Sequence, residues 1–157
     1  MSEAWIIDAC RTPRGIGKKG KGALAEQHPQ HLGATVLKAI AERNDVNTAD
    51  VGDVIFGTSS QRGVQSGDLA RMAALDAGYD VKASGVTLDR FCGSGISSVQ
   101  LAAMNILSGT EDVAIGGKGR ACAGCCLNPR GDGWQAAGGP DKDQEIVDRF
   151  GQDNFFK

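Results

Sequence analysis

The stretch SGVTLDRFCGSGISSVQLAAMNILSGTEDVAI, residues 84–115, carries the pattern that decides the fold. It opens with a short apolar run at residues 84–88, which predicts a strand weakened by Gly85. A long helical pattern follows and ends at Gly109, after which residues 112–115 are expected to form a returning strand. A strand, a helix and a strand in this order are typical of a parallel sheet covered by a helix.

Two further strands are predicted earlier in the chain. Residues 4–9 form a short apolar run that fits a buried strand, and Pro13 then restricts the backbone and ends it. Residues 14–31 are rich in glycine and indicate a loop, and residues 53–57 again have the pattern of a buried strand. Because these strands alternate with helices, the predicted fold class is α/β, a layered fold with a mostly parallel sheet flanked by helices.

The helices are predicted from the spacing of apolar residues. One is expected to run for about twelve residues from Leu32 to a stop at Asn44, and another covers residues 69–75, capped by Ser66 or Asp68. The helix within residues 84–115 carries an apolar stripe along one face. Its members are Ile96, Val99, Ala103, Ile106 and Leu107.

Composition narrows the classes of protein to consider. The chain has 157 residues, enough for one domain with a real core, and 23 glycines, which favour tight turns. A formal net charge of -2 without a long basic run argues against nucleic acid as a partner. The small cluster of Lys18, Lys19 and Lys21 is read as a solvated loop. No apolar stretch is long enough for a membrane span, so a cytoplasmic protein without a membrane partner is expected.

Cys92 is the candidate nucleophile. It stands between a strand and the first turn of a helix, where unpaired N–H groups and the helix dipole favour a thiolate. Gly93 and Gly95 leave space for a bulky thioester, and the exposed amides could hydrogen-bond an oxyanion. The alternative is a buried cysteine that only packs within a glycine-rich turn. The residues alone leave both interpretations open.

The segment at residues 89–95, Asp-Arg-Phe-Cys-Gly-Ser-Gly, resembles the segment around the acyl-accepting cysteine of thiolases. The resemblance extends, in the family's order and spacing, to residues 8–13, 32–33, 54–57 and 113–117. Residues 11–15, 22–24 and 28–29 are most similar to bacterial acetyl-CoA acetyltransferases of this family. Ketosynthases also use a cysteine at a helix start, but the sequence around theirs differs.

The resemblance implies a two-step acyl transfer. Cys92 would take an acyl group from acyl-CoA, with its own backbone N–H helping to hold the oxyanion, and an acyl-CoA carbanion or free CoA would then attack the acyl-cysteine. Coenzyme A thioesters are substrates, and neither a metal nor another cofactor is implied. Thiolases associate as dimers or tetramers, so we expect a homo-oligomer that uses the edge at residues 84–88.

The resemblance also implies groups that this sequence does not match. The family's activating histidine, second cysteine and water-positioning asparagine lie in its carboxyl-terminal half. This chain has only His28 and His31, both before the first predicted helix begins. The fold is therefore expected to be incomplete relative to the family, and a catalytically incomplete fragment without turnover is the alternative function.

The resemblance ends at Gly117, which divides the chain into a thiolase amino-terminal domain at residues 1–117 and an unmatched tail at residues 118–157. A frame change or an early stop in the coding sequence would explain this break. The alternative is that the tail has a purpose of its own, because Cys122 and Cys125 are spaced to chelate zinc. No second pair of cysteines stands nearby, and the odd total of 5 cysteines argues against a disulfide framework.

Overall fold

The computed structural model describes residues 3–15, 23–24, 26–59 and 61–119. The chain divides into two units, residues 1–126 and 127–157, and every described residue belongs to the first. Three sequence predictions lie outside the described residues: the lysine cluster at Lys18, Lys19 and Lys21, the candidate zinc ligands Cys122 and Cys125, and the tail from residue 120 onward.

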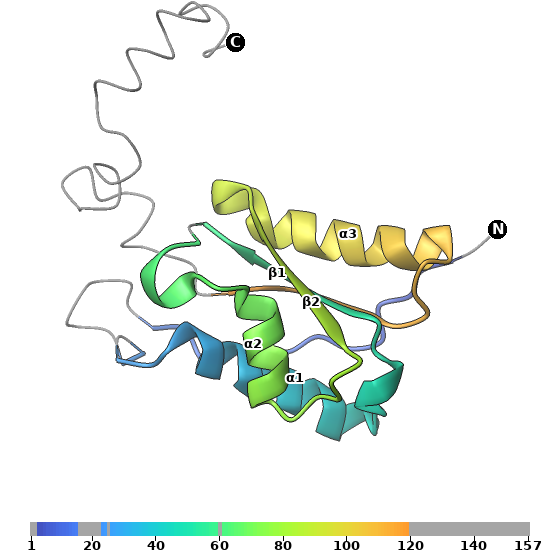
Figure 1. Cartoon of the computed structure of the whole chain (residues 1–157), viewed down its shortest axis with the longest axis horizontal. Helices are drawn as coiled ribbons and strands as arrows, with labels where there is room; N and C mark the ends of the chain where they lie inside the picture. Colours follow the sequence, from blue (N-terminus) through green and yellow to red (C-terminus); the bar gives the residue numbers. More distant parts are fainter. Residues whose placement is uncertain (1–2, 16–22, 25, 60, 120–157) are drawn as a thin grey trace, which may run out of the picture. The chain divides into compact units, whose positions relative to one another are not determined.

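A three-stranded parallel sheet forms the centre of the described region (Figure 1). It contains β1 (Asp53–Thr58), β2 (Ser84–Asp89) and β3 (Ala114–Lys118), in the order β2-β1-β3. Phe56 of the central strand pairs with Thr87 on one side and Gly117 on the other. The α/β fold with a parallel sheet is confirmed, although β3 begins two residues later than the predicted strand at residues 112–115.

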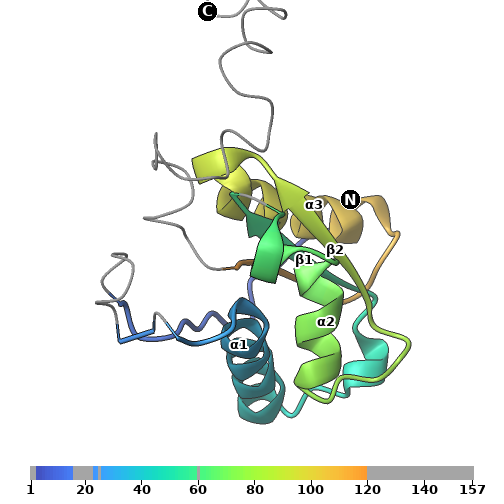
Figure 2. The same ribbon diagram turned by 60° about the vertical axis from the view of Figure 1, so that its left-hand side comes forward.

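Within the described residues, three helices accompany the sheet: α1 (Pro29–Asn44), α2 (Leu69–Asp76) and α3 (Ser94–Ser108). The short 3-10 turns are η1 (Thr48–Asp50), η2 (Gly63–Gln65) and η3 (Phe91–Gly93). In the views of Figures 1 and 2, α3 covers one face of the sheet, while α1 and α2 lie side by side on the other. Among the described residues, no helix is long and apolar enough to cross a membrane.

The first two helices agree with the sequence patterns except at one boundary. α1 starts three residues before Leu32, because Pro29 fits a first helical position and His28 Nδ1 accepts a hydrogen bond from the N–H of Gln30 at 3.2 Å. The predicted loop is correspondingly shorter. α2 is capped by Asp68, one of the two predicted candidates, whose carboxylate accepts from the N–H of Arg71 at 3.4 Å.

The hydrophobic core lies between the sheet and the pair α1 and α2. Its members are Leu37, Val51, Val54, Phe56, Leu69, Ala70, Ala73, Ala74, Tyr79 and Ala83. Phe56 is central because a Cβ added to Gly33 would lie 2.8 Å from its ring, and one added to Gly117 would lie 2.9 Å from it. Glycine at both positions therefore lets α1 and β3 approach the ring closely.

The apolar stripe predicted for α3 is not the face that packs on the sheet. Ile96 is 77% exposed, whereas the buried residues of this helix are Ser94, Ser97, Ser98 and Ala102. The reason is close backbone packing: a Cβ on Gly116 of β3 would lie 2.7 Å from the Cα of Val99. Only small side chains fit at such an approach, so the larger residues of α3 face outward.

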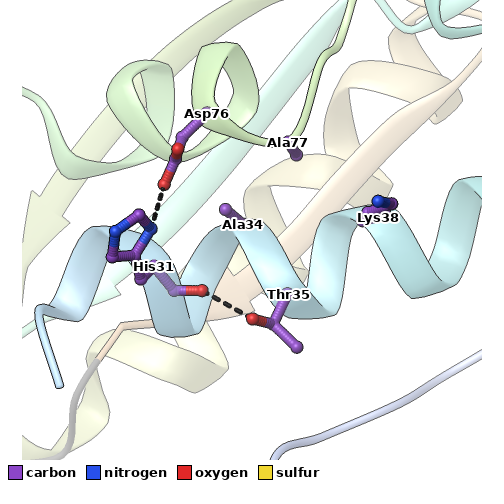
Figure 3. Close-up of a pocket in the computed structure, with 6 residues that line it drawn as sticks. All are labelled: His31, Ala34, Thr35, Lys38, Asp76 and Ala77. Atoms are coloured by element: carbon purple, nitrogen blue, oxygen red, sulfur yellow. Dashed lines mark hydrogen bonds and ion pairs between the residues drawn. The ribbon is translucent and has the colours of Figure 1, made fainter.

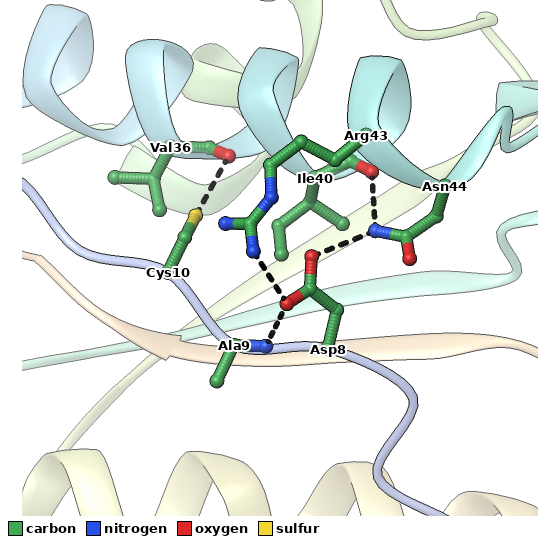
Figure 4. A network of polar contacts seen from close by, with 7 residues as sticks. All are labelled: Asp8, Ala9, Cys10, Val36, Ile40, Arg43 and Asn44. Carbon is green, nitrogen blue, oxygen red and sulfur yellow. Dashed lines mark hydrogen bonds and ion pairs between the residues drawn. The ribbon is translucent and has the colours of Figure 1, made fainter.

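The predicted buried strand at residues 4–9 is also wrong. Residues 4–9 pair with no described strand, and Trp5, Ile6 and Ile7 are exposed. The segment is instead tied to α1 by polar contacts (Figure 4). Asp8 accepts hydrogen bonds from Asn44 Nδ2 at 2.8 Å and Arg43 Nη2 at 3.0 Å, and the thiol of Cys10 donates to the carbonyl of Val36 at 3.4 Å.

Candidate active site

Cys92 lies in η3, the turn that connects the end of β2 to the start of α3. The carboxyl ends of β1, β2 and β3 meet at this edge of the sheet, because the strands are parallel and in register. The cysteine is free and exposed, so it is not the buried packing residue that the sequence left as the alternative. An exposed thiol at the start of a helix is accessible to an electrophile.

The backbone before Cys92 is strained. Phe91 has a φ of 46°, in the left-handed region that costs a residue with a Cβ roughly 1–2 kcal/mol. The strain is compensated locally, since the N–H of Phe91 donates to Asp89 Oδ1 at 2.8 Å. Strained backbone of this kind clusters at functional sites, where surrounding contacts hold it in place.

The side chain of Ser94 attaches the Cys92 turn to the sheet through polar contacts. Its hydroxyl oxygen lies 2.6 Å from the carbonyl oxygen of Thr58 and 2.7 Å from that of Phe91, and it accepts from the N–H of Arg90 at 2.8 Å. One side chain therefore connects the end of β1, the turn and the first residue of α3. The hydroxyl of Thr58 is also buried here and has no hydrogen-bond partner among the described residues.

The N–H of Cys92 differs from the N–H groups on either side of it. Those of Phe91, Gly93 and Ser94 donate to Asp89, Arg90 and Phe91, respectively. Within the described part of the chain, Cys92 N–H makes no hydrogen bond, and no side chain caps α3. The turn therefore presents a free donor beside an exposed thiol, as an oxyanion site requires.

The two glycines next to Cys92 are not equally open. A Cβ on Gly93 would make ordinary contacts of 3.7 Å with the Arg90 side chain. A Cβ on Gly95 would be tighter, 3.1 Å from Cδ of Lys118, because the lysine lies across it. The Gly93 side of the turn is therefore the more open one, while a long cationic side chain occupies the Gly95 side.

Lys118 and Arg90 are the site residues that the sequence patterns did not single out. Lys118 Nζ lies 3.4 Å from the carbonyl oxygen of Cys92, and Lys118 is the last residue of β3. The available signal was topological, because a strand running parallel to β1 must end at the edge where the turn begins. Arg90 follows β2 directly and is exposed.

A surface groove adjoins the turn between the end of β2 and α3. It is lined by Leu88, Asp89, Arg90, Ser97, Gln100, Leu101 and Met104. Its lining combines apolar side chains with one carboxylate and one guanidinium.

Neither histidine of the chain belongs to the Cys92 turn. His28 caps α1, and His31 Nδ1 lies 2.7 Å from Asp76 Oδ2 beside a small pocket between α1 and α2 (Figure 3). Both are on the layer opposite to α3. The described residues therefore place no histidine that could take the proton of the Cys92 thiol.

These features define an α/β protein that presents a cysteine at a helix start on the carboxyl edge of a parallel sheet. The family described as the thiolase amino-terminal domain matches residues 4–119. A steroid 3-ketoacyl-CoA thiolase of Mycobacterium tuberculosis is 45% identical over 117 residues, which cover 74% of this chain and 28% of the relative. A 3-oxoadipyl-CoA/3-oxo-5,6-dehydrosuberyl-CoA thiolase of Escherichia coli is 41% identical over 118 residues, 74% of this chain and 29% of that protein.

A solved structure leads to the same family. The crystal structure of the Bacillus anthracis acetyl-CoA acetyltransferase superposes with a TM-score of 0.58 at 36% identity, covering 62% of this chain and 24% of that one. The chain belongs to the thiolase family, a family of acyltransferase enzymes, and corresponds to its amino-terminal domain. It spans 28% of the length of the M. tuberculosis relative and 29% of the E. coli one.

Proposed function

We propose that this chain contributes the acyl-accepting half of a thiolase site, with Cys92 as the nucleophile. The substrate is an acyl-CoA thioester, and the reaction is the condensation of two acetyl-CoA molecules to acetoacetyl-CoA and CoA, or the reverse thiolysis. The observation that carries the proposal is the exposed thiol of Cys92 on a strained turn, next to its own N–H, which makes no hydrogen bond to another described residue.

The chemistry of the first step follows from this arrangement. Cys92 first loses its thiol proton to solvent, and the thiolate sulfur attacks the thioester carbonyl. The carbonyl oxygen becomes an oxyanion, and the N–H of Cys92 stabilises it. Collapse of this intermediate breaks the bond to the sulfur of CoA, which leaves as a thiolate and takes up a proton from water. The product is acyl-Cys92, ready for attack by a carbanion or by free CoA.

A second candidate function is favoured by the position of the histidines. His28 and His31 are both engaged on α1, so the described residues supply no histidine for the proton of the Cys92 thiol or of the attacking carbon. On this alternative, the chain is a catalytically incomplete fragment. It would be acylated slowly at Cys92 and would not turn over.

The experiment incubates the purified 157-residue chain with acetyl-CoA and locates the acetyl group by peptide mass spectrometry. We expect acetylation at Cys92 that is absent from Cys92→Ala and unchanged in Cys10→Ala. Acetylation of Cys10 as fast as Cys92 would contradict the nucleophile assignment. Thiolysis of acetoacetyl-CoA by the same samples separates the two candidates, since Cys92-dependent turnover excludes the incomplete fragment.

A further inference from the structure

Lys118 makes a contact with the Cys92 turn that connects two elements. Its methylene groups lie over Gly95, where an added Cβ would be 3.2 Å from Lys118 Cβ and 3.1 Å from Cδ. Its ammonium group then reaches the carbonyl oxygen of Cys92 at 3.4 Å. Lys118, at the end of β3, therefore packs over the first turn of α3 and contacts the backbone of Cys92.

The ammonium group of Lys118 has no carboxylate partner within the described residues. The ion pairs there join His31 to Asp76, Lys38 to Glu42 and Arg43 to Asp8, all away from the turn. The nearby Asp89 directs one carboxylate oxygen to the N–H of Phe91. The charge of Lys118 is consequently not neutralised by an ion pair, and it is brought close to Cys92.

Arg90 is a second cation on the other side of the turn. A Cβ on Gly93 would lie 3.7 Å from both Cγ and Cδ of Arg90, so the start of this side chain lies beside Gly93. Lys118 lies beside Gly95. Two cationic side chains therefore contact the Cys92 turn, one at Gly93 and one at Gly95, and Asp89 is the acidic residue nearest to Cys92 in the sequence.

We propose that Lys118 is a positioning residue for Cys92, which holds the turn through the Cys92 carbonyl oxygen and makes the thiol selective for negatively charged electrophiles. This inference rests on the proposed function, because the attack of Cys92 on a thioester places negative charge beside the sulfur. A nearby ammonium stabilises such charge and also attracts an anionic acyl donor. The contact that supports the positioning role is the one between Lys118 Nζ and the carbonyl oxygen of Cys92, at 3.4 Å.

The test compares two alkylating reagents that differ in charge, iodoacetate and iodoacetamide. In both reactions the thiol loses its proton to the buffer, the thiolate sulfur forms a bond to carbon and iodide leaves, so neither needs a base from the protein or a second substrate. The ratio of the two rates at Cys92 is measured by peptide mass spectrometry in the full chain and in Lys118→Met and Lys118→Arg. Cys10, which is half-buried against Val36, is the internal reference.

We expect Lys118→Met to lower the iodoacetate to iodoacetamide ratio at Cys92 about fivefold, the effect of losing one unit charge at roughly 4 Å from the reagent in water. Lys118→Arg should restore the ratio, and the Cys10 ratio should not change. Lys38→Met is the matched control, because it removes an exposed lysine remote from the turn. A purely structural role would change both rates equally and leave the ratio as it was.

An unchanged ratio in Lys118→Met would overturn the proposal, as would a fall that Lys118→Arg did not reverse. Far-ultraviolet circular dichroism verifies that each variant is folded before the rates are compared. Failure of this inference can be told apart from failure of the proposed function, because alkylation requires only the thiol and no acyl transfer. A chain that shows the charge selectivity but takes no acetyl group would leave Lys118 in its role and refute the acyl transfer.

Discussion

Gly57 and Ser94 are in direct backbone contact: a Cβ on Gly57 would lie 2.7 Å from the Cβ of Ser94, and closer still to its carbonyl group. This contact brings the start of α3 onto the central strand. We expect Gly57→Ala to lower the free energy of unfolding by roughly 1–3 kcal/mol, because the backbone must shift to admit a methyl group. Urea denaturation of both proteins measures this difference in the free energy of unfolding.

Gly93→Ala is the matched control for this substitution. Its φ is -81° and its Cβ would make only ordinary contacts, so we expect a change within about 0.5 kcal/mol. Equal losses in the two variants would show that the contact between Gly57 and Ser94 is not the cause.

Ser94→Ala should loosen the Cys92 turn as well as destabilise the chain. The hydroxyl contacts the carbonyl oxygens of Thr58 and Phe91 and accepts from the N–H of Arg90, so its removal takes one hydrogen bond from each of these groups, of which the one to Thr58 is buried. We expect a loss of about 1–3 kcal/mol and an altered rate of Cys92 alkylation. Ser108→Ala, at the exposed end of the same helix, should change neither quantity.

The two large aliphatic residues Leu37 and Ile96 should respond differently to truncation. Leu37 is 1% exposed in the core, whereas Ile96 is 77% exposed on α3. We expect Leu37→Ala to cost roughly 2–5 kcal/mol and Ile96→Ala less than about 0.5 kcal/mol. Thermal denaturation of both variants is the measurement. A large loss in Ile96→Ala would show that the outer face of α3 is covered in solution.

The contribution of Asp8 to the stability of the fold should be lost in acid. The hydrogen bond from Asn44, and to a smaller extent the N–H of Ala9 and the charge of Arg43, hold the pKa of Asp8 below its usual value. Because the pKa of Asp8 is lower in the folded state than in the unfolded chain, the ionised carboxylate stabilises the fold at pH values above the unfolded pKa. This contribution is lost as the pH falls through the pKa of the folded state. Asp8→Asn should therefore lower the melting temperature near pH 7, and its effect should shrink as the pH falls below the ordinary Asp value of 3.8.

Whereas the contribution of Asp8 to stability is lost at low pH, that of Tyr79 should be lost at high pH. Its hydroxyl donates to the carbonyl of Leu37 at 3.0 Å, and burial raises the pKa of Tyr79 to about 12 from an ordinary value of 10.0. The neutral form is the one that the fold favours, so its contribution is complete below pH 10 and is lost as the pH rises toward 12.

Tyr79→Phe tests this dependence. At neutral pH it should cost about 1 kcal/mol through the lost hydrogen bond, and its stability should not fall through the ionisation of residue 79. The advantage of the wild-type chain over Tyr79→Phe should thus shrink above pH 10, as measured by urea denaturation at a series of pH values. A constant advantage across this range would contradict the buried, neutral phenol.

The sequence by itself determined the order of most elements and the local setting of Cys92. The strands at residues 53–57 and 84–88 and the end of α3 at Gly109 depend on short-range spacing and capping, which neighbouring residues encode. The placement of Cys92 between a strand and a helix is of the same kind. Its catalytic role, with that of Gly93 and Gly95, stays a prediction. The sequence left the cap of α2 open between Ser66 and Asp68, and the structure selects Asp68.

Only the tertiary structure decided which faces are buried and which side chains surround Cys92. The small face of α3 packs because Gly57 and Gly116 bring strand backbone too close for larger residues, and an apolar stripe in the sequence does not reveal such distances. The segment at residues 4–9 has the apolar pattern of a buried strand, yet it has no sheet partner within the described residues. Lys118 lies 26 residues after Cys92, and only the parallel register of β3 brings the two together.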